Sequence, residues 1–125
     1  VKDWENELGN IPNVKSNHPE KTGHPCQYPI ELVERCVLAL TNKNSWILDP
    51  FSGAGSAIIA AIKNGRNAIG IDKETEYCKI AEKRIEDLRE GNLKIRPINQ
   101  SIHKPSKRDK VAQMPKEWQE LNFKG

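Results

Sequence analysis

The chain has 125 residues, enough for one small domain but short for a complete nucleic-acid-modifying enzyme. Hydrophobic residues make up 36% of the sequence and charged residues 30%, so a central part can fold around a core while the polar ends bury little. No apolar run approaches the roughly 20 residues of a membrane span, and the first residues lack a signal-peptide pattern, so we expect no membrane partner and a cytoplasmic protein.

The three cysteines, Cys26, Cys36 and Cys78, lie far apart in the sequence. They form no Cys-x-x-Cys pair, and no histidine cluster is present to complete a zinc site. We therefore expect reduced structural thiols and no metal.

The first half of the chain predicts a connector, a helix and a strand. Residues 1–28 contain three prolines and no sustained hydrophobic period, which is typical of an extended segment lying on something else. Apolar residues then recur at helical spacing over about 29–41. The apolar run at 46–48, ended by Asp49, is typical of a strand buried on both faces in a parallel sheet.

The second half repeats this order. A helix rich in alanine and isoleucine is predicted over 57–63, a second strand over 67–72, and the clearest amphipathic helix over 75–90. Residues 93–96 are a candidate third strand. Alternating strands and helices predict an α/β fold with a parallel, incomplete sheet and right-handed crossovers. The expected organisation is therefore a connector (1–28), an α/β core (29–98) and an irregular tail (99–125).

Positive charge gathers near the end of the chain. Residues 92–116 carry seven lysines and arginines against the single acid Asp109. This asymmetry favours a polyanionic partner, although a solvated tail fits the pattern equally well.

Residues 49–56, with the sequence Asp-Pro-Phe-Ser-Gly-Ala-Gly-Ser, join the first predicted strand to the next helix, where open parallel sheets bind ligands. A phosphate-binding P-loop would need a lysine after the second glycine, and a dinucleotide fingerprint would need a third glycine in place of Ile58. Asp49 would also repel a pyrophosphate. It would attract the sulfonium and ammonium groups of S-adenosylmethionine (AdoMet).

A second carboxylate, Asp72, ends the next predicted strand, where an acid can accept hydrogen bonds from ribose hydroxyls. The two strand-end acids would then bracket one nucleoside. The alternative is that Asp49 only caps the turn over 52–56 and that Asp72 is an ordinary strand-end residue.

Three motifs in order, His-Pro-Cys-Gln-Tyr-Pro at 24–29, the loop at 49–56 and Gly-Ile-Asp at 70–72, resemble successive motifs of the prokaryotic DNA amino-methyltransferases of restriction-modification systems. The likeness covers roughly residues 11–118. It implies a partial Rossmann-like methyltransferase fold, AdoMet as cofactor, double-stranded DNA as partner and a prokaryotic or phage origin. The reaction implied is methyl transfer to the exocyclic amino group of adenine or, less readily, cytosine.

The resemblance also implies roles for individual residues. The family segment that closes over the methionine end of AdoMet corresponds to Lys21, Thr22, His24 and Pro25. The cofactor loop and ribose contact correspond to Asp49, Pro50, Phe51, Ser52, Gly53, Gly55, Ser56 and Asp72. We expect DNA phosphates to be contacted from the basic tail by Lys104, Lys107, Arg108 and Lys110.

One departure from the family bears directly on mechanism. Family members carry an (Asp/Asn/Ser)-Pro-Pro-(Tyr/Phe) motif that binds the target amino group and stacks the flipped base. This sequence contains no Pro-Pro pair, so no catalytic residue is assigned. We expect the C-terminal, AdoMet-binding portion of such an enzyme, inactive alone and associating with a complementary N-terminal part or with itself.

Alternatives remain at this point. The chain could be a non-catalytic AdoMet-binding or DNA-binding subunit, a relic of a methyltransferase, or part of an RNA or small-molecule methyltransferase with the same cofactor fold. The choice between adenine and cytosine and the recognition sequence stay open, because the discriminating residues belong to the part that carries the Pro-Pro motif.

Overall fold

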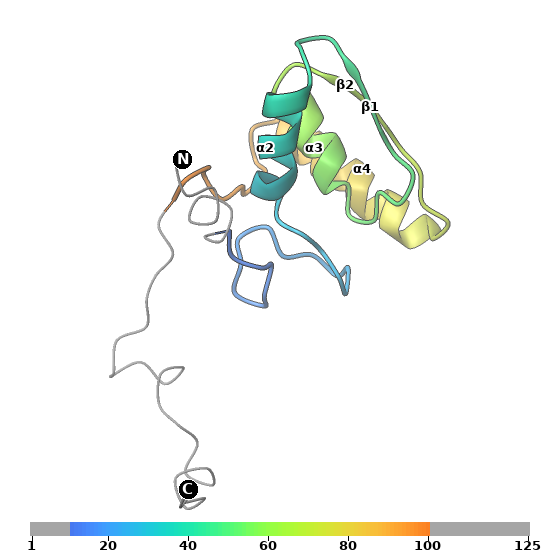
Figure 1. Cartoon of the computed structure of the whole chain (residues 1–125). Coiled ribbons are helices and arrows are strands. Elements are labelled where there is room, and N and C mark those ends of the chain that lie inside the picture. Colours follow the sequence, from blue (N-terminus) through green and yellow to red (C-terminus); the bar gives the residue numbers. More distant parts are fainter. Residues whose placement is uncertain (1–10, 101–125) are drawn as a thin grey trace, which may run out of the picture.

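The computed structural model describes residues 11–100, which form three helices beside a two-stranded parallel sheet (Figure 1). In chain order the elements are α2 (Ile30–Leu40), β1 (Trp46–Asp49), α3 (Ser56–Lys63), β2 (Asn67–Gly70) and α4 (Thr75–Arg89). The strands pair in parallel, and α3 makes the crossover between them. The predicted α/β class with an incomplete parallel sheet is confirmed.

The predicted elements agree with the observed ones to within two residues, with one exception. The candidate strand at 93–96 is wrong, because this stretch is irregular. The backbone N–H of Arg96 donates to the carboxylate of Glu20 at 3.0 Å, not to a neighbouring strand, while Leu93 and Ile95 pack against the core. The predicted boundaries of connector, core and tail at residues 28 and 98 stay predictions.

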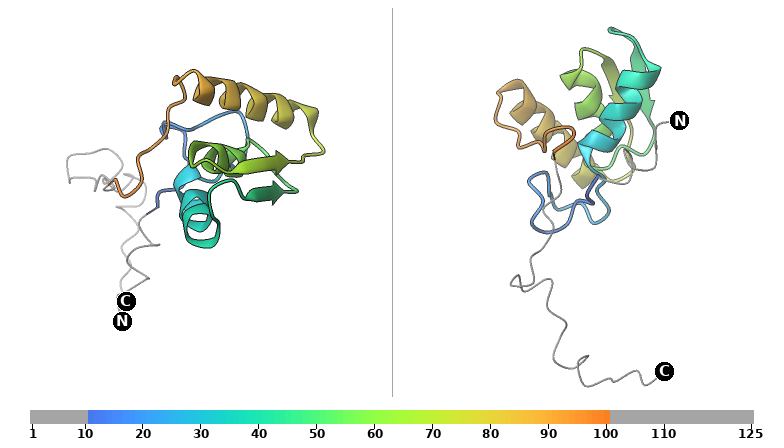
Figure 2. Two further views of the ribbon diagram at one scale, coloured as in Figure 1. Left: turned by 90° about the horizontal axis from the view of Figure 1, so that it is seen from above. Right: turned by 60° about the vertical axis from the view of Figure 1, so that its left-hand side comes forward.

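The helices form one layer with α3 in the middle. α3 contacts both strands and is flanked by α2 and α4, and the sheet lies along one side of this layer (Figure 2). The core is built from Ile30 and Val37 of α2 and Ile59 and Ala60 of α3. Small alanine side chains on α3 let the neighbouring elements approach closely, which places the loop before α3 deep in the fold.

The two faces of the sheet differ sharply. Ile47 of β1 turns toward the helices and packs against the core. Its neighbours Trp46 and Leu48 are 69% and 62% exposed, and Ile69 of β2 and Ile71 just after it are also exposed. Parallel sheets are normally covered on both faces. The expectation that the strand at 46–48 is buried on both faces is wrong for residues 11–100, where helices cover only one face of the sheet and leave an apolar surface open on the other.

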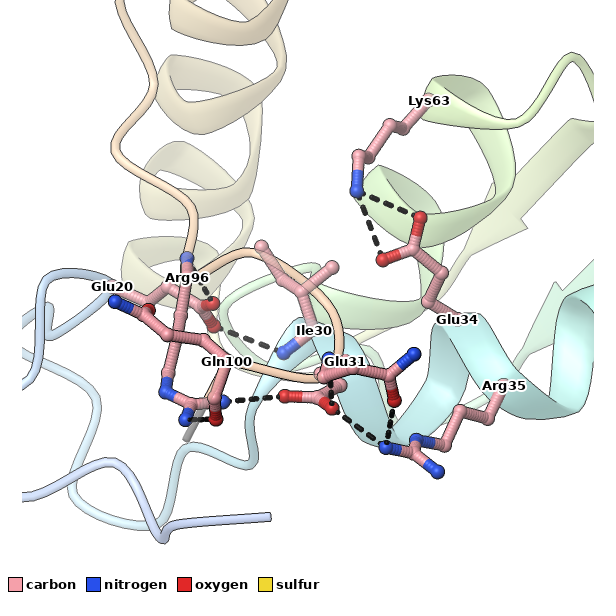
Figure 3. A network of polar contacts seen from close by, with 9 residues as sticks. Glu20, Ile30, Glu31, Glu34, Arg35, Lys63, Arg96 and Gln100 are labelled. Carbon is pink, nitrogen blue, oxygen red and sulfur yellow. Dashed lines mark hydrogen bonds and ion pairs between the residues drawn. The ribbon is translucent and has the colours of Figure 1, made fainter. Parts of the chain in front are cut away.

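A buried polar network holds the segments before α2 and after α4 to the start of α2 (Figure 3). The carboxylate of Glu20 accepts hydrogen bonds from the backbone N–H groups of Ile30 (2.9 Å) and Arg96 (3.0 Å). Glu31 pairs with the guanidinium groups of Arg96 (2.7 Å) and Arg35 (2.9 Å). Burial alone would raise the pKa of Glu31, but the hydrogen bond from Arg35 and the charge of Arg96 bring it below its ordinary value. The network therefore fixes the segment that precedes α2, which carries His24.

Cys26 and Cys36 are exposed free thiols, so they do not fill the core as structural thiols would. Among residues 11–100, no helix has both the length and the apolar character needed to cross a bilayer.

Candidate cofactor-binding site

Residues 52–55 of the loop between β1 and α3 are buried, and three of their backbone N–H groups are hydrogen-bonded. Ser52 N–H donates to the carbonyl of Ile71 (2.9 Å), Gly53 N–H to a carboxylate oxygen of Asp72 (2.8 Å) and Gly55 N–H to the carbonyl of Ser52 (2.7 Å). Gly53 and Gly55 have φ values of +48° and +74°, in the left-handed region that disfavours other residues. The sequence thus supplies glycine at the two positions where the backbone requires it.

Asp72 lies just beyond β2, which ends two residues earlier than predicted. Its carboxylate accepts the Gly53 N–H and the Glu74 N–H (2.9 Å), and these two hydrogen bonds hold the pKa of Asp72 below its usual value. A carboxylate offers about four lone-pair sites, so about two remain for a ligand. The residue is therefore more than an ordinary strand-end acid, because it fixes the loop and retains acceptor capacity.

Asp49 ends β1 on the same side of the loop. One of its carboxylate oxygens accepts the Phe51 N–H (3.1 Å), and the other accepts the hydroxyl of Tyr28 (3.0 Å). Burial and the charge of Asp49 raise the pKa of Tyr28 to about 12, so the phenol stays protonated and donates near neutral pH. Neither donor belongs to the turn over 52–56, so these contacts do not support the alternative in which Asp49 caps that turn. Pro50 and Phe51 are exposed beside Asp49.

The segment before α2 brings His24 against the loop. A Cβ atom on Gly53 would lie 2.9 Å from His24 Nε2, and the imidazole also packs edge-on against Tyr77 of α4, with ring centroids 4.3 Å apart. Lys21 donates to the carbonyl of His24 (2.9 Å), and the hydroxyl of Thr22 donates to the side chain of Gln27 (2.8 Å). Lys21 and Thr22 thus order the His24 segment, and Pro25 is exposed within it.

The structure therefore brings His24, the 49–56 loop and Asp72 together from three separate parts of the chain. The predicted DNA-contacting residues Lys104, Lys107, Arg108 and Lys110 lie outside the described residues.

Two residues at the loop were missed by the sequence reasoning. Tyr28 belongs to the motif at 24–29, but nothing in the sequence indicates that its hydroxyl reaches Asp49. Arg84 gave a signal: it stands in the apolar stripe of α4, three residues after Ala81, where a charge is unexpected.

A family model for DNA methylases matches residues 2–83 of this chain. The chain belongs to the DNA methylase family. The resemblance to prokaryotic DNA amino-methyltransferases of restriction-modification systems is thereby confirmed.

Individual DNA methylases agree with this assignment. The chain is 51% identical over 69 residues to the Type II methyltransferase M2.DpnII of Streptococcus pneumoniae, covering 55% of this chain and 26% of the relative. It is 37% identical over 81 residues to the DNA adenine methyltransferase YhdJ of Escherichia coli K12, covering 62% of this chain and 28% of the relative. The chain therefore spans about a quarter of the length of the curated relatives it matches.

A solved structure supports the fold of this DNA methylase segment. The crystal structure of the M1.HpyAVI-SAM complex superposes with a TM-score of 0.51 at 38% identity, covering 60% of this chain and 42% of that chain. SAM is S-adenosylmethionine, so a structural neighbour of this segment was solved with AdoMet.

Proposed function

We propose that this segment binds AdoMet for a DNA methyltransferase that modifies the exocyclic amino group of adenine or, less readily, cytosine in double-stranded DNA. The observation that carries the proposal is the loop at Gly53 and Gly55, preset by Asp72, which still has acceptor sites to offer. The adenine methyltransferase among the relatives favours adenine. The neighbour solved with SAM favours AdoMet.

The residues at the loop fit this cofactor better than a phosphate-bearing one. Asp49 at the end of β1 and Asp72 just beyond β2 present carboxylates, which suit a sulfonium, an ammonium and ribose hydroxyls and would repel a pyrophosphate. AdoMet would supply an activated methyl group. Asp72 would accept hydrogen bonds from the ribose, and Asp49 would attract the cationic end.

The remaining residues predicted to bind the cofactor lie in two segments. The first segment is the loop itself, in which we propose that the cofactor is bound by Pro50, Phe51, Ser52, Gly53, Gly55 and Ser56. The second is the segment before α2, for which we retain Lys21, Thr22, His24 and Pro25. His24 is the member of this segment that touches the loop directly, so it is the best placed to close over the methionine end.

Catalysis would depend on a complementary methyltransferase part that carries the Pro-Pro motif, which this sequence lacks. The open sheet face, formed by Trp46, Leu48, Ile69 and Ile71, is the surface we propose for this partner. Its apolar character suits the helices that normally cover the second face of a parallel sheet. The chain matches only about a quarter of its relatives, so a region of suitable size exists in them.

Double-stranded DNA would be bound partly through the basic residues Lys104, Lys107, Arg108 and Lys110, which lie beyond the described part. Phosphate contacts of this kind act on all sequences alike and weaken with salt.

Calorimetry with AdoMet tests the cofactor assignment through Asp72→Ala, measured with and without the complementary part. Loss of charge-assisted hydrogen bonds should weaken binding about 10- to 100-fold. Glu82→Ala, which removes an exposed carboxylate of α4, is the matched control and should bind like the parent. Equal affinities for the Asp72→Ala and parent chains would remove Asp72 from the site.

A further inference from the structure

Arg84 is a buried charged residue of α4, whose other charged residues are exposed or half-buried. It is 4% exposed, and it and Ala81 are the two buried residues of α4. Burial lowers the pKa of Arg84, and the nearby charge of Glu20 opposes this effect. Arginine is rarely buried this fully unless it is paired, so its contacts need an explanation.

The contacts of Arg84 are to the loop, not to a carboxylate. Its Nη1 donates to the carbonyl of Ala54 and lies 3.4 Å from the hydroxyl of Ser56. The same peptide unit, between Ala54 and Gly55, donates its N–H to the carbonyl of Ser52 at 2.7 Å. Both ends of this peptide plane are therefore held, one of them by a side chain from α4.

The loop also contacts α4 at Ala81, about one helical turn before Arg84. A Cβ atom on Gly55 would lie 2.9 Å from the Cβ of Ala81, so this glycine sits directly on the helix. Meanwhile Nε and Nη2 of Arg84 have no hydrogen-bond partner within the described structure. Buried donors without partners cost stability, so an apolar side chain would serve a purely structural purpose better.

We propose that Arg84 is a positioning residue that locks the Ala54–Gly55 peptide and so presets the loop for AdoMet. The proposal rests on the proposed function of the loop. Fixing a backbone before the ligand arrives removes an ordering cost from binding, so the effect of Arg84 should fall on cofactor affinity.

The test compares Arg84→Met and Arg84→Lys with Arg89→Met, which removes an exposed arginine from the last turn of the same helix. Amide hydrogen exchange in the full chain reports on the loop without any ligand. The Gly55 N–H is the probe, and the Ile71 N–H, which donates to the backbone carbonyl of Asp49 just beyond β2, is the internal reference. AdoMet affinity is measured on the same proteins by calorimetry.

We expect Gly55 exchange to be about ten-fold faster in Arg84→Met, with the Ile71 rate unchanged, because one hydrogen bond from a charged donor is lost. AdoMet binding should weaken about ten-fold or more. Arg84→Lys, which keeps one donor within reach, should lie between Arg84→Met and the parent. Arg89→Met should match the parent in both measurements.

Three results would overturn the proposal. Gly55 exchange unchanged in both Arg84 variants would mean that the peptide is not held by this side chain. Equal acceleration at Gly55 and Ile71 would mean that Arg84 acts on the whole fold. Faster Gly55 exchange with unchanged AdoMet affinity would separate the loop contact from cofactor binding. If the parent itself binds no AdoMet with or without the complementary part, the proposed function fails, and the exchange rates still decide whether Arg84 holds the loop.

Discussion

The loop between β1 and α3 and the open face of the sheet differ in how far the described residues cover them. At the loop, backbone groups of Ser52, Gly53 and Gly55 are each paired, and α4 closes over it with Ala81 and Arg84. On the open face, large apolar side chains stand exposed although the sheet is parallel. The contrast indicates that contacts within residues 11–100 are enough to fix the loop, while helices within these residues cover only one face of the sheet.

The same contrast explains how a segment covering about a quarter of its relatives can hold an ordered site. The contacts that fix the loop reach 19 residues along the chain to Asp72 and 30 residues to Arg84, so a short stretch of chain contains them. Covering both faces of a sheet requires many more residues.

Substituting Gly55 and Gly65 in turn should separate the effect of backbone strain from the effect of the contact between the loop and α4. Gly55 and Gly65 have nearly equal φ values of +74° and +73°, but a Cβ on Gly55 would meet Ala81 at 2.9 Å, whereas one on Gly65 would meet nothing within 4 Å. The left-handed backbone costs about 1–2 kcal/mol at either site. Overpacking should add about 1–3 kcal/mol for Gly55→Ala alone.

Denaturant unfolding and AdoMet calorimetry check this pair. Gly55→Ala should lose about 10- to 100-fold in AdoMet affinity, following the overpacking cost. Gly65→Ala should be less stable than the parent yet bind AdoMet equally well. Similar AdoMet losses in both variants would show that general strain, not the contact of the loop with α4, governs binding.

Acid pH should loosen the loop by a smaller amount. Two backbone N–H groups hold the pKa of Asp72 below its usual value of about 3.9. Because the folded pKa is depressed, the contribution of Asp72 is present above about pH 4 and is lost as the pH falls through the folded pKa. The amide resonance of Gly53, which donates to Asp72, should titrate with a midpoint below about 3.9. A midpoint at or above that value would contradict the observed hydrogen bonding.

Much of the fold could be predicted because hydrophobic period and turn residues are local signals. The helices and strands were placed to within two residues, since the clear helical period of α4 and the glycines around α3 leave few alternatives. The false strand at 93–96 shows the limit of this approach. Its apolar residues do pack on the core, but Arg96 is bound by Glu20, some 76 residues earlier, and no local pattern encodes that contact.

The site could be predicted at the residues whose chemistry is unusual for their place. Glycines after a strand and acids near two strand ends stand out in the sequence. In the structure the Gly53 N–H donates to the Asp72 carboxylate at 2.8 Å. The pairing of Tyr28 with Asp49 depends on how the chain before α2 folds back over the loop, which spacing cannot give. Whether these residues bind AdoMet stays a prediction.

We propose that this chain holds the cofactor and that its open sheet face receives the complementary part. Transfer of tritiated methyl groups from AdoMet to DNA tests it most directly, measured with and without a polypeptide bearing the Pro-Pro motif. Leu48→Ser changes the open face, and Leu32→Ser changes an exposed leucine of α2 as the matched control. We expect no transfer by the chain alone, transfer when the polypeptide is added to the parent or to Leu32→Ser, and transfer strongly reduced with Leu48→Ser. Methylation by the chain alone would show that no complementary part is needed, and equal restoration in Leu48→Ser and Leu32→Ser would show that the open face does not receive it.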